Sequence, residues 1–91
     1  MEKSYFGAQR LLCENGETAE LEYYILREPL GAYTGYGTEI VMQRPRDRES
    51  AAMRRVTTSR ARMDALLRLL CENGVTPCTL RDVLEDELKK G

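Results

Sequence analysis

The chain has 91 residues, of which 42% are hydrophobic and 32% are charged, and its formal net charge is -1. This length leaves room for one hydrophobic core, so we expect a single domain over residues 1–91. The sequence contains no histidine. This excludes Ser-His-Asp catalytic triads, Cys-His catalytic pairs and every zinc site that needs an imidazole ligand.

The three cysteines, Cys13, Cys71 and Cys78, form no C-x-x-C pair, and three thiolates leave a tetrahedral zinc site one ligand short. We expect free thiols that pack as small apolar side chains. No hydrophobic run has the length of a signal-peptide core or of a membrane span. These features predict a cytoplasmic protein with no metal, no cofactor and no membrane attachment.

The first half of the chain has the alternating pattern of β-strands. Asn15 and Gly16 form a pair that is typical of the type I′ turn of a hairpin. Residues 29–35 are rich in glycine and indicate a loop, and Pro45 ends a strand because proline donates no ladder hydrogen bond. The sequence therefore predicts an antiparallel meander with strands over residues 4–13, 20–28, 36–43 and 51–57.

The second half has apolar residues at helical spacing. Thr58 or Ser59 can cap the first helix, and Gly74 suits the left-handed position after its last turn. Thr79 and Asp82 match a capping box at the start of the second helix. We expect helices over residues 59–73 and 79–89, with apolar stripes formed by Met63, Leu66, Leu67, Leu70, Leu80, Val83, Leu84 and Leu88.

Strands followed by helices indicate an α+β fold, here an antiparallel sheet of three or four strands with two C-terminal helices on one face. The hexapeptide LLCENG occurs at residues 11–16 and again at residues 69–74. Helical periodicity precedes the second copy only. We therefore interpret the first copy as a strand that enters a hairpin and the second as a helix that reaches its end.

Two helices can cover only one face of the sheet, so alternate strand residues should point outward. Tyr24, Leu26 and Val41 belong to this outward set, and Phe6 and Leu12 join it if the first strand has the expected phase. A contiguous exposed apolar patch marks a partner surface, and a symmetric homodimer is the commonest way to cover one. The alternatives are scattered surface hydrophobic residues without a partner, or an N-terminal segment that folds over the patch.

These features favour a non-enzymatic protein-interaction module that self-associates. We expect no catalytic residues, because the sequence has no cofactor motif and no acid pair with distinct environments. The alternative is a weak nucleic-acid-binding protein, because arginine forks match phosphate oxygens. The near-zero net charge argues against this alternative. The arginines concerned are Arg44, Arg46, Arg48, Arg54 and Arg55.

The run VTPCTLRDVLED at residues 75–86, together with TTSR at 57–60 and YGTEI at 36–40, resembles a known family. This is a family of short uncharacterised proteins of Gram-positive anaerobic bacteria, catalogued as a domain of unknown function. The resemblance covers about residues 20–88 and implies no activity. A histidine often stands in that family where this chain has Thr79, so no metal or acid–base role of that histidine carries over.

Overall fold

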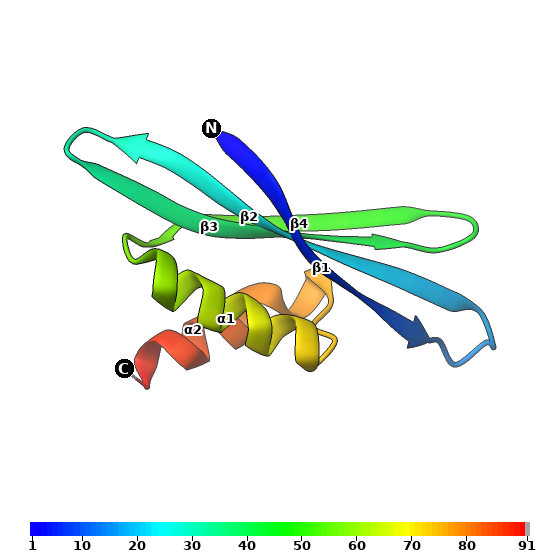
Figure 1. Cartoon of the computed structure of the whole chain (residues 1–91). Coiled ribbons are helices and arrows are strands. Elements are labelled where there is room, and N and C mark those ends of the chain that lie inside the picture. The colour runs from blue at the N-terminus through cyan, green and yellow to red at the C-terminus, as the bar shows by residue number, and fades with distance from the viewer. Residues whose placement is uncertain (91) are drawn as a thin grey trace.

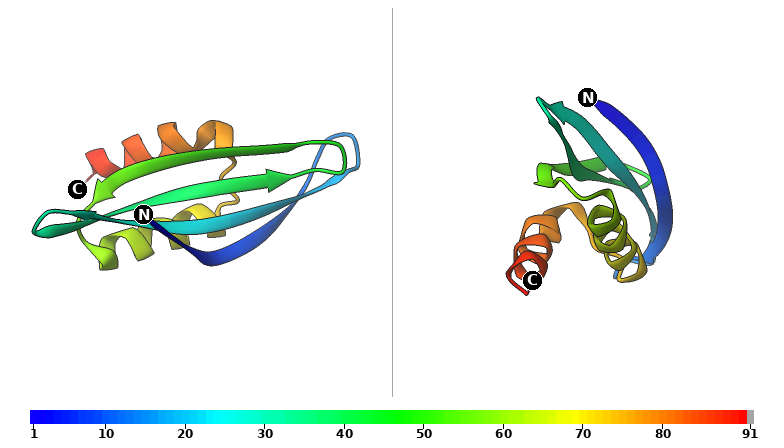
Figure 2. Two further views of the ribbon diagram at one scale, coloured as in Figure 1. Left: turned by 90° about the horizontal axis from the view of Figure 1, so that it is seen from above. Right: turned by 60° about the vertical axis from the view of Figure 1, so that its left-hand side comes forward.

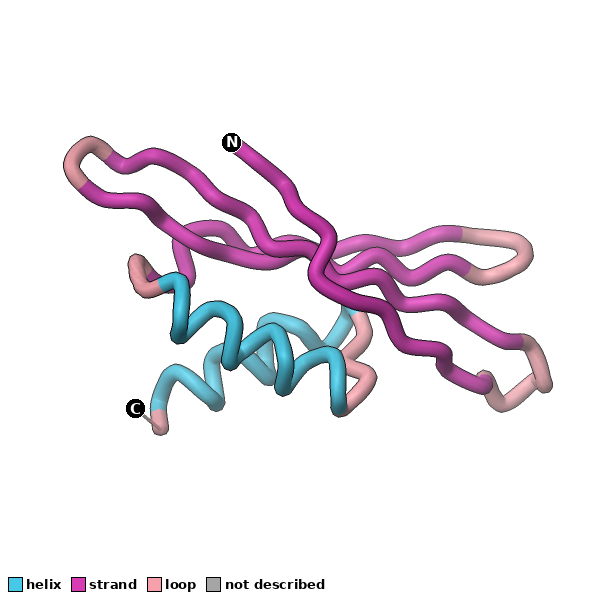
Figure 3. Tube along the Cα trace, in the orientation of Figure 1, coloured by secondary structure: helices cyan, strands magenta, loops and turns pink. Residues whose placement is uncertain are grey.

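The computed structural model describes residues 1–90, which form one antiparallel sheet and a helical layer. The strands are ordered β1-β2-β3-β4, and the helices lie on the same face of the sheet (Figure 1; Figure 3). This confirms the expected α+β meander. The elements are β1 (Glu2–Leu12), β2 (Thr18–Leu30), β3 (Tyr33–Gln43), β4 (Arg48–Thr57), α1 (Arg60–Glu72), a short 3-10 helix η1 (Pro77–Thr79) and α2 (Leu80–Lys89).

The sheet is longer than the helical layer. The molecule measures 47 × 27 × 17 Å along its principal axes. The tip of the β2–β3 hairpin extends past the helices at one end, and the other two hairpin tips extend at the opposite end (Figure 2). The helices therefore cover only the middle of one sheet face. Within residues 1–90 no helix is long and apolar enough to cross a membrane.

The core lies between the two central strands and the helices. The register pairs Leu21 with Met42 and Tyr23 with Ile40, so these side chains share the face that the helices cover. Because side chains alternate along a strand, every second residue of β2 and β3 is buried here. The buried core consists of Ala19, Leu21, Tyr23, Ile25, Ile40, Met42, Met63, Leu66, Leu67, Leu70, Val75, Leu80 and Leu84.

Helix α1 begins and ends where the sequence predicts. The Ser59 hydroxyl accepts a hydrogen bond of 3.2 Å from the Arg62 backbone N–H. After the last turn, Gly74 has a φ of 59°, and the Val75 N–H donates to the Leu70 carbonyl. Local sequence signals alone determine this cap and this stop, so both predictions are confirmed.

A buried hydrogen bond ties the sheet to the connection between α1 and η1. The Tyr23 hydroxyl donates to the carbonyl of Val75 at 2.9 Å, and the Tyr23 side chain is completely buried. Burial raises the pKa of this phenol well above its usual range. The bond fixes the position of a turn that lies 52 residues further along the chain.

Strands β2 and β3 are longer than expected, and the predicted loop over residues 29–35 is wrong. The two strands continue to Leu30 and from Tyr33, so only Gly31 and Ala32 form the turn. Proline is tolerated at position 29 because β1 begins opposite Arg27, which leaves β2 with a neighbour on one side only.

The turn between β1 and β2 is not the expected type I′ turn. Gly16 has a φ of 86°, whereas Asn15 has no positive φ. The Gly16 N–H donates to Cys13 O, and the Cys13 N–H donates to Glu17 O. This pattern is typical of a three-residue loop in which a glycine follows an ordinary turn.

The expected capping box at the start of α2 is also wrong. Thr79 belongs to η1, and its hydroxyl donates to the carbonyl of Thr76 rather than capping α2. The turn of 3-10 helix that precedes α2 already continues the backbone into it, so no side-chain cap forms. The two LLCENG copies do adopt the expected strand and helix, and each ends on a glycine with positive φ.

The structure makes Gly74→Ala a clean test of the left-handed backbone. A Cβ atom at this position would meet no atom closer than 4.0 Å, so only the backbone conformation opposes alanine. We expect Gly74→Ala to lower the free energy of unfolding by about 1 kcal/mol. Urea denaturation measures this change.

Gly74→Asn is the matched control, because asparagine tolerates the left-handed region better than alanine does. We expect its loss to be smaller. Equal stability of Gly74→Ala and the wild type would contradict the role of this glycine.

Candidate functional site

The sheet face that the helices leave uncovered is called the helix-free face below. The register places Tyr24 opposite Glu39, and Leu26 opposite Gly37. Val41 lies opposite Glu22 on the same face. The three residues predicted to point away from the helices therefore do so.

Two of these three side chains are nevertheless buried, which corrects the expectation of an exposed apolar patch centred on them. Leu26 is only 4% exposed and Val41 only 1%. Both residues lie on central strands that have a neighbouring strand on each side: Lys3 and Gly37 lie opposite Leu26, and Glu22 and Ser50 lie opposite Val41. Tyr24 is half-buried: the Tyr5 ring lies edge-on to it at 5.9 Å, and the Lys3 ammonium lies 4.8 Å from its ring centre.

The exposed apolar side chains of this face lie on β1 and, with Tyr33, at the β2–β3 tip instead. A β-bulge between Tyr5 and Gly7 shifts the register of β1 against β2. The bulge turns Phe6 toward the core, so the expectation that Phe6 points outward is wrong. Tyr5 is 60% exposed and Leu12 is 74% exposed. Sequence alternation alone does not reveal such a bulge.

An open hollow lies beside Tyr5, between β1 and β2. Its volume is about 420 Å³, and Ala8 contributes a small side chain to its lining. Arg10 and Glu20 line its far part and form an ion pair of 3.6 Å. The hollow therefore combines an exposed aromatic ring with balanced charge.

Three of the five arginines considered as phosphate contacts are held by carboxylates. The Arg44 guanidinium pairs with Asp47, at 3.0 Å from Nη2 to Oδ2, and with Glu49 at 3.3 Å. Arg54 and Arg55 both bind Glu28, at 2.6 and 3.0 Å. Among residues 1–90, no ion pair involves Arg46 or Arg48, and both are exposed near the β3–β4 tip. The arginines thus form separate clusters rather than one basic surface.

The cluster around Glu28 spans three strands. Glu28 lies on β2 and the two arginines lie on β4, so the side chains must cross β3, a distance of roughly 10 Å. At this place β3 has Gly35 and Gly37, which have no side chains to block the crossing. A Cβ atom at Gly37 would lie 2.2 Å from the Met53 carbonyl oxygen. Sequence reasoning overlooked Glu28, although the Gly-x-Gly pattern in the neighbouring strand was a usable signal.

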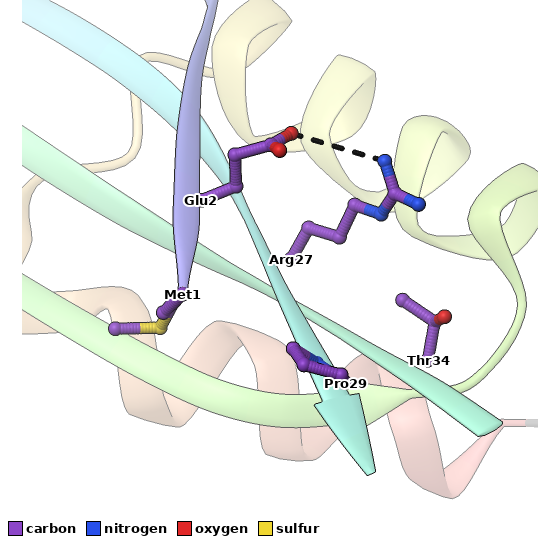
Figure 4. Close-up of a pocket in the computed structure, with 5 residues that line it drawn as sticks. All are labelled: Met1, Glu2, Arg27, Pro29 and Thr34. Carbon is purple, nitrogen blue, oxygen red and sulfur yellow. Dashed lines mark ion pairs between the residues drawn. The ribbon is translucent and has the colours of Figure 1, made fainter. Parts of the chain in front are cut away.

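Two further hollows lie away from these residues. One, of about 360 Å³, is lined by Met1, Pro29 and Thr34 and contains the ion pair between Glu2 and Arg27 (Figure 4). Both charged side chains are more than half exposed, and their charges cancel. The pair is therefore solvated and leaves no net charge to attract a ligand.

The second hollow, of about 440 Å³, lies between β4 and η1 and includes Glu49 and Cys78. All three cysteines are free thiols. Cys13 and Cys71 pack against the core as expected, whereas Cys78 is exposed. Within residues 1–90, no three Cys, Asp or Glu side chains gather in a way that could hold a metal ion.

The Glu28 cluster predicts a pH-dependent stability. Hydrogen bonds from Arg55 and Arg54 lower the pKa of Glu28 to about 2. A carboxylate with a lowered pKa stabilises the fold above its unfolded pKa of roughly 4.3, and this contribution is lost as the pH falls toward 2. We expect Glu28→Gln to show a smaller fall in melting temperature between pH 5 and pH 2 than the wild type.

Circular dichroism melts across this pH range measure the effect. Glu14→Gln is the matched control, since no ion pair within residues 1–90 involves this exposed loop glutamate. We expect it to follow the wild-type pH dependence. An unchanged pH dependence in Glu28→Gln would contradict the stabilising role of the carboxylate.

Comparisons with known proteins give a family but no activity. Neither the curated proteins nor the solved structures give a match. A family model described as "Family of unknown function (DUF6514)" matches residues 2–90. This match covers nearly the whole chain, including every strand and helix. The chain therefore belongs to the DUF6514 family, whose function is unknown.

Proposed function

We propose that this chain is a non-enzymatic protein-interaction module that forms a homodimer in the cytoplasm. The binding surface is the β1 side of the helix-free face. The observation that carries the proposal is the exposure of Tyr5 and Leu12 on a face that no other element within residues 1–90 covers. Exposed large apolar side chains on one face suit an interaction surface, and Tyr5 and Leu12, at different places along β1, offer two separate contacts of this kind.

Other features of this face support a second copy as the partner. The hollow of about 420 Å³ beside Tyr5 can accept a side chain, and the same face presents Leu12 as a projecting apolar group. A two-fold interface needs both features on the same surface. The cross-strand ion pairs Lys3–Glu39 and Arg10–Glu20 balance the charge, so two copies do not repel each other strongly.

The dimensions of the molecule also fit a dimer. A stable interface buries roughly 800 Å² on each partner. The molecule extends 47 and 27 Å along its two longest axes, and the sheet runs the length of the longest. The face therefore has enough area for a standard interface. Three free thiols support a cytoplasmic location, because disulfides are rare there.

Light scattering after size-exclusion chromatography tests the proposal. The chain has a mass of 10.4 kDa, and we expect twice that mass at tens of micromolar protein. Tyr5→Arg combined with Leu12→Arg should convert the dimer into a folded monomer, because both side chains are exposed. Substitutions of Leu26 or Val41 are unsuitable, because those side chains are buried and their loss would disturb the fold.

Tyr33→Arg is the matched control. It removes a tyrosine that is 70% exposed at the β2–β3 tip, on the same face but beyond the end of β1, and should leave the dimer intact. Circular dichroism checks that each variant is folded. A wild-type mass of one chain would refute the dimer, and a dimer that persists in the double variant would refute this surface.

Nucleic-acid binding is the weaker proposal, because the guanidinium groups of Arg44, Arg54 and Arg55 are directed to carboxylates. Only Arg46 and Arg48 remain from the predicted set, and affinity for nucleic acid grows with the number of neutralised phosphates. We expect no retained single-stranded RNA in a filter-binding assay at low salt. Retention that falls steeply with salt and is lost in Arg46→Ala, Arg48→Ala would support this function instead.

A further inference from the structure

The most unusual feature outside the proposed dimer surface is the cluster of Glu28, Arg54 and Arg55. Each guanidinium uses two nitrogens on the same carboxylate. The Nε atoms of both arginines lie 3.3 Å from Glu28 Oε1, and their Nη2 atoms lie 2.6 and 3.0 Å from Oε2. Glu28 is 15% exposed, whereas the two arginine side chains are 51% and 60% exposed. The carboxylate thus holds two arginine heads at the surface.

The backbone is strained to bring these arginines together. Consecutive residues of a regular strand point to opposite faces, so neighbours in sequence cannot normally reach one carboxylate. Here the register jumps from Tyr36 opposite Thr57 to Thr38 opposite Met53, so three residues of β4 bulge opposite Gly37. Within the bulge Arg55 has a φ of 55°, and no other non-glycine residue within residues 1–90 has a positive φ.

The strain exceeds what a structural brace needs. One arginine would neutralise Glu28 and link β2 to β4, and glycine would fit a left-handed position in the bulge without strain. The bulge also lets both Met53 and Val56 pack against the core, so packing accounts for the bulge but not for an arginine, rather than a glycine, at its left-handed position. The second arginine and its conformation therefore call for a role beyond holding the sheet together.

A second cluster of charged side chains, around Arg44, has the opposite ratio of arginines to carboxylates. Arg44 is one guanidinium between two carboxylates, Asp47 and Glu49. The Glu28 cluster has two guanidinium groups and one carboxylate. Hydrogen bonds from both arginines keep the pKa of Glu28 at about 2, so the cluster carries one net positive charge at neutral pH. Of these two clusters, only the Glu28 cluster has a net positive charge that can attract an anion.

The unused donors define what this anion is. Each guanidinium has five N–H donors and spends two of them on Glu28, which leaves three free donors on each arginine. A tetrahedral phosphate offers more acceptor oxygens than a planar carboxylate and can meet two forks that are not coplanar. We propose that Arg54 and Arg55, positioned by Glu28, form a binding site for the phosphate group of a small molecule. This proposal does not depend on the dimer, because both arginines lie on β4, at the opposite edge of the sheet from β1.

Titration with inorganic phosphate, followed by NMR of the arginine Nε–H groups at constant ionic strength, tests the site on the full chain. We expect saturable shifts of the Arg54 and Arg55 signals at millimolar phosphate, with acetate at least several-fold weaker. Arg44 serves as the internal control and should not shift. Equal shifts at Arg44, or equal effects of phosphate and acetate, would overturn the proposal.

Arg55→Gly separates binding from folding. Glycine relieves the positive φ and so offsets the lost hydrogen bonds to Glu28. We expect a folded variant that has lost the phosphate-dependent shift at Arg54. Arg55→Asn, which also tolerates this backbone, provides a second variant if the first does not fold. Arg46→Gly in the β3–β4 loop is the matched control and should bind phosphate as the wild type does. Retained binding in both Arg55 variants would refute the site.

A short single-stranded oligonucleotide at the same phosphate concentration distinguishes the source of the phosphate group. We expect clearly weaker shifts of the Arg54 and Arg55 signals, because each backbone phosphodiester carries one charge and two free oxygens, whereas a terminal phosphate carries roughly two charges and three oxygens. Shifts that include Arg46 and Arg48 would indicate a nucleic-acid backbone and would overturn a small-molecule ligand.

Discussion

The apolar faces of β2 and β3 must be covered by only two helices, and the rest of the structure depends on this constraint. Leu21, Tyr23 and Ile40 are completely buried beneath α1 and the segment that follows it. The hydrogen bond from Tyr23 to Val75 fixes the connection between the helices against the sheet. The helices are shorter than the strands and lie on one face only, so the hairpin tips and the other sheet face remain outside the core (Figure 1).

The helix-free face shows how a central strand protects its apolar residues without a second layer. Leu26 and Val41 are buried although no helix lies over them, and both lie on central strands with a neighbouring strand on each side. At the edge strand β1 this protection ends on one side. Tyr5 and Leu12 are therefore exposed, and the apolar character of the face moves from its centre to its edge.

Irregular backbone determines where the functional candidates lie. The bulge in β1 turns Phe6 into the core, and the bulge in β4 brings Arg54 and Arg55 to a single carboxylate. Gly37 permits the second bulge, since a side chain at this position would collide with the backbone of β4. Each candidate surface thus depends on a departure from regular strand geometry, which re-aims side chains that alternation would place elsewhere.

The sequence by itself determined the features that depend on local preferences. Alternation identified the inward and outward residues of β2 and β3, and the Ser59 cap and Gly74 identified the ends of α1. Local patterns failed where contacts distant in sequence compete with them. Pro29 stays in a strand because β1 stops short, and Thr79 is no cap because η1 precedes α2. Tertiary structure alone decided the burial of Leu26 and Val41, the inward turn of Phe6 and the pairing of two arginines with Glu28. Each of these depends on which strands lie side by side and on where their register shifts, and a pattern of residues along one strand contains neither.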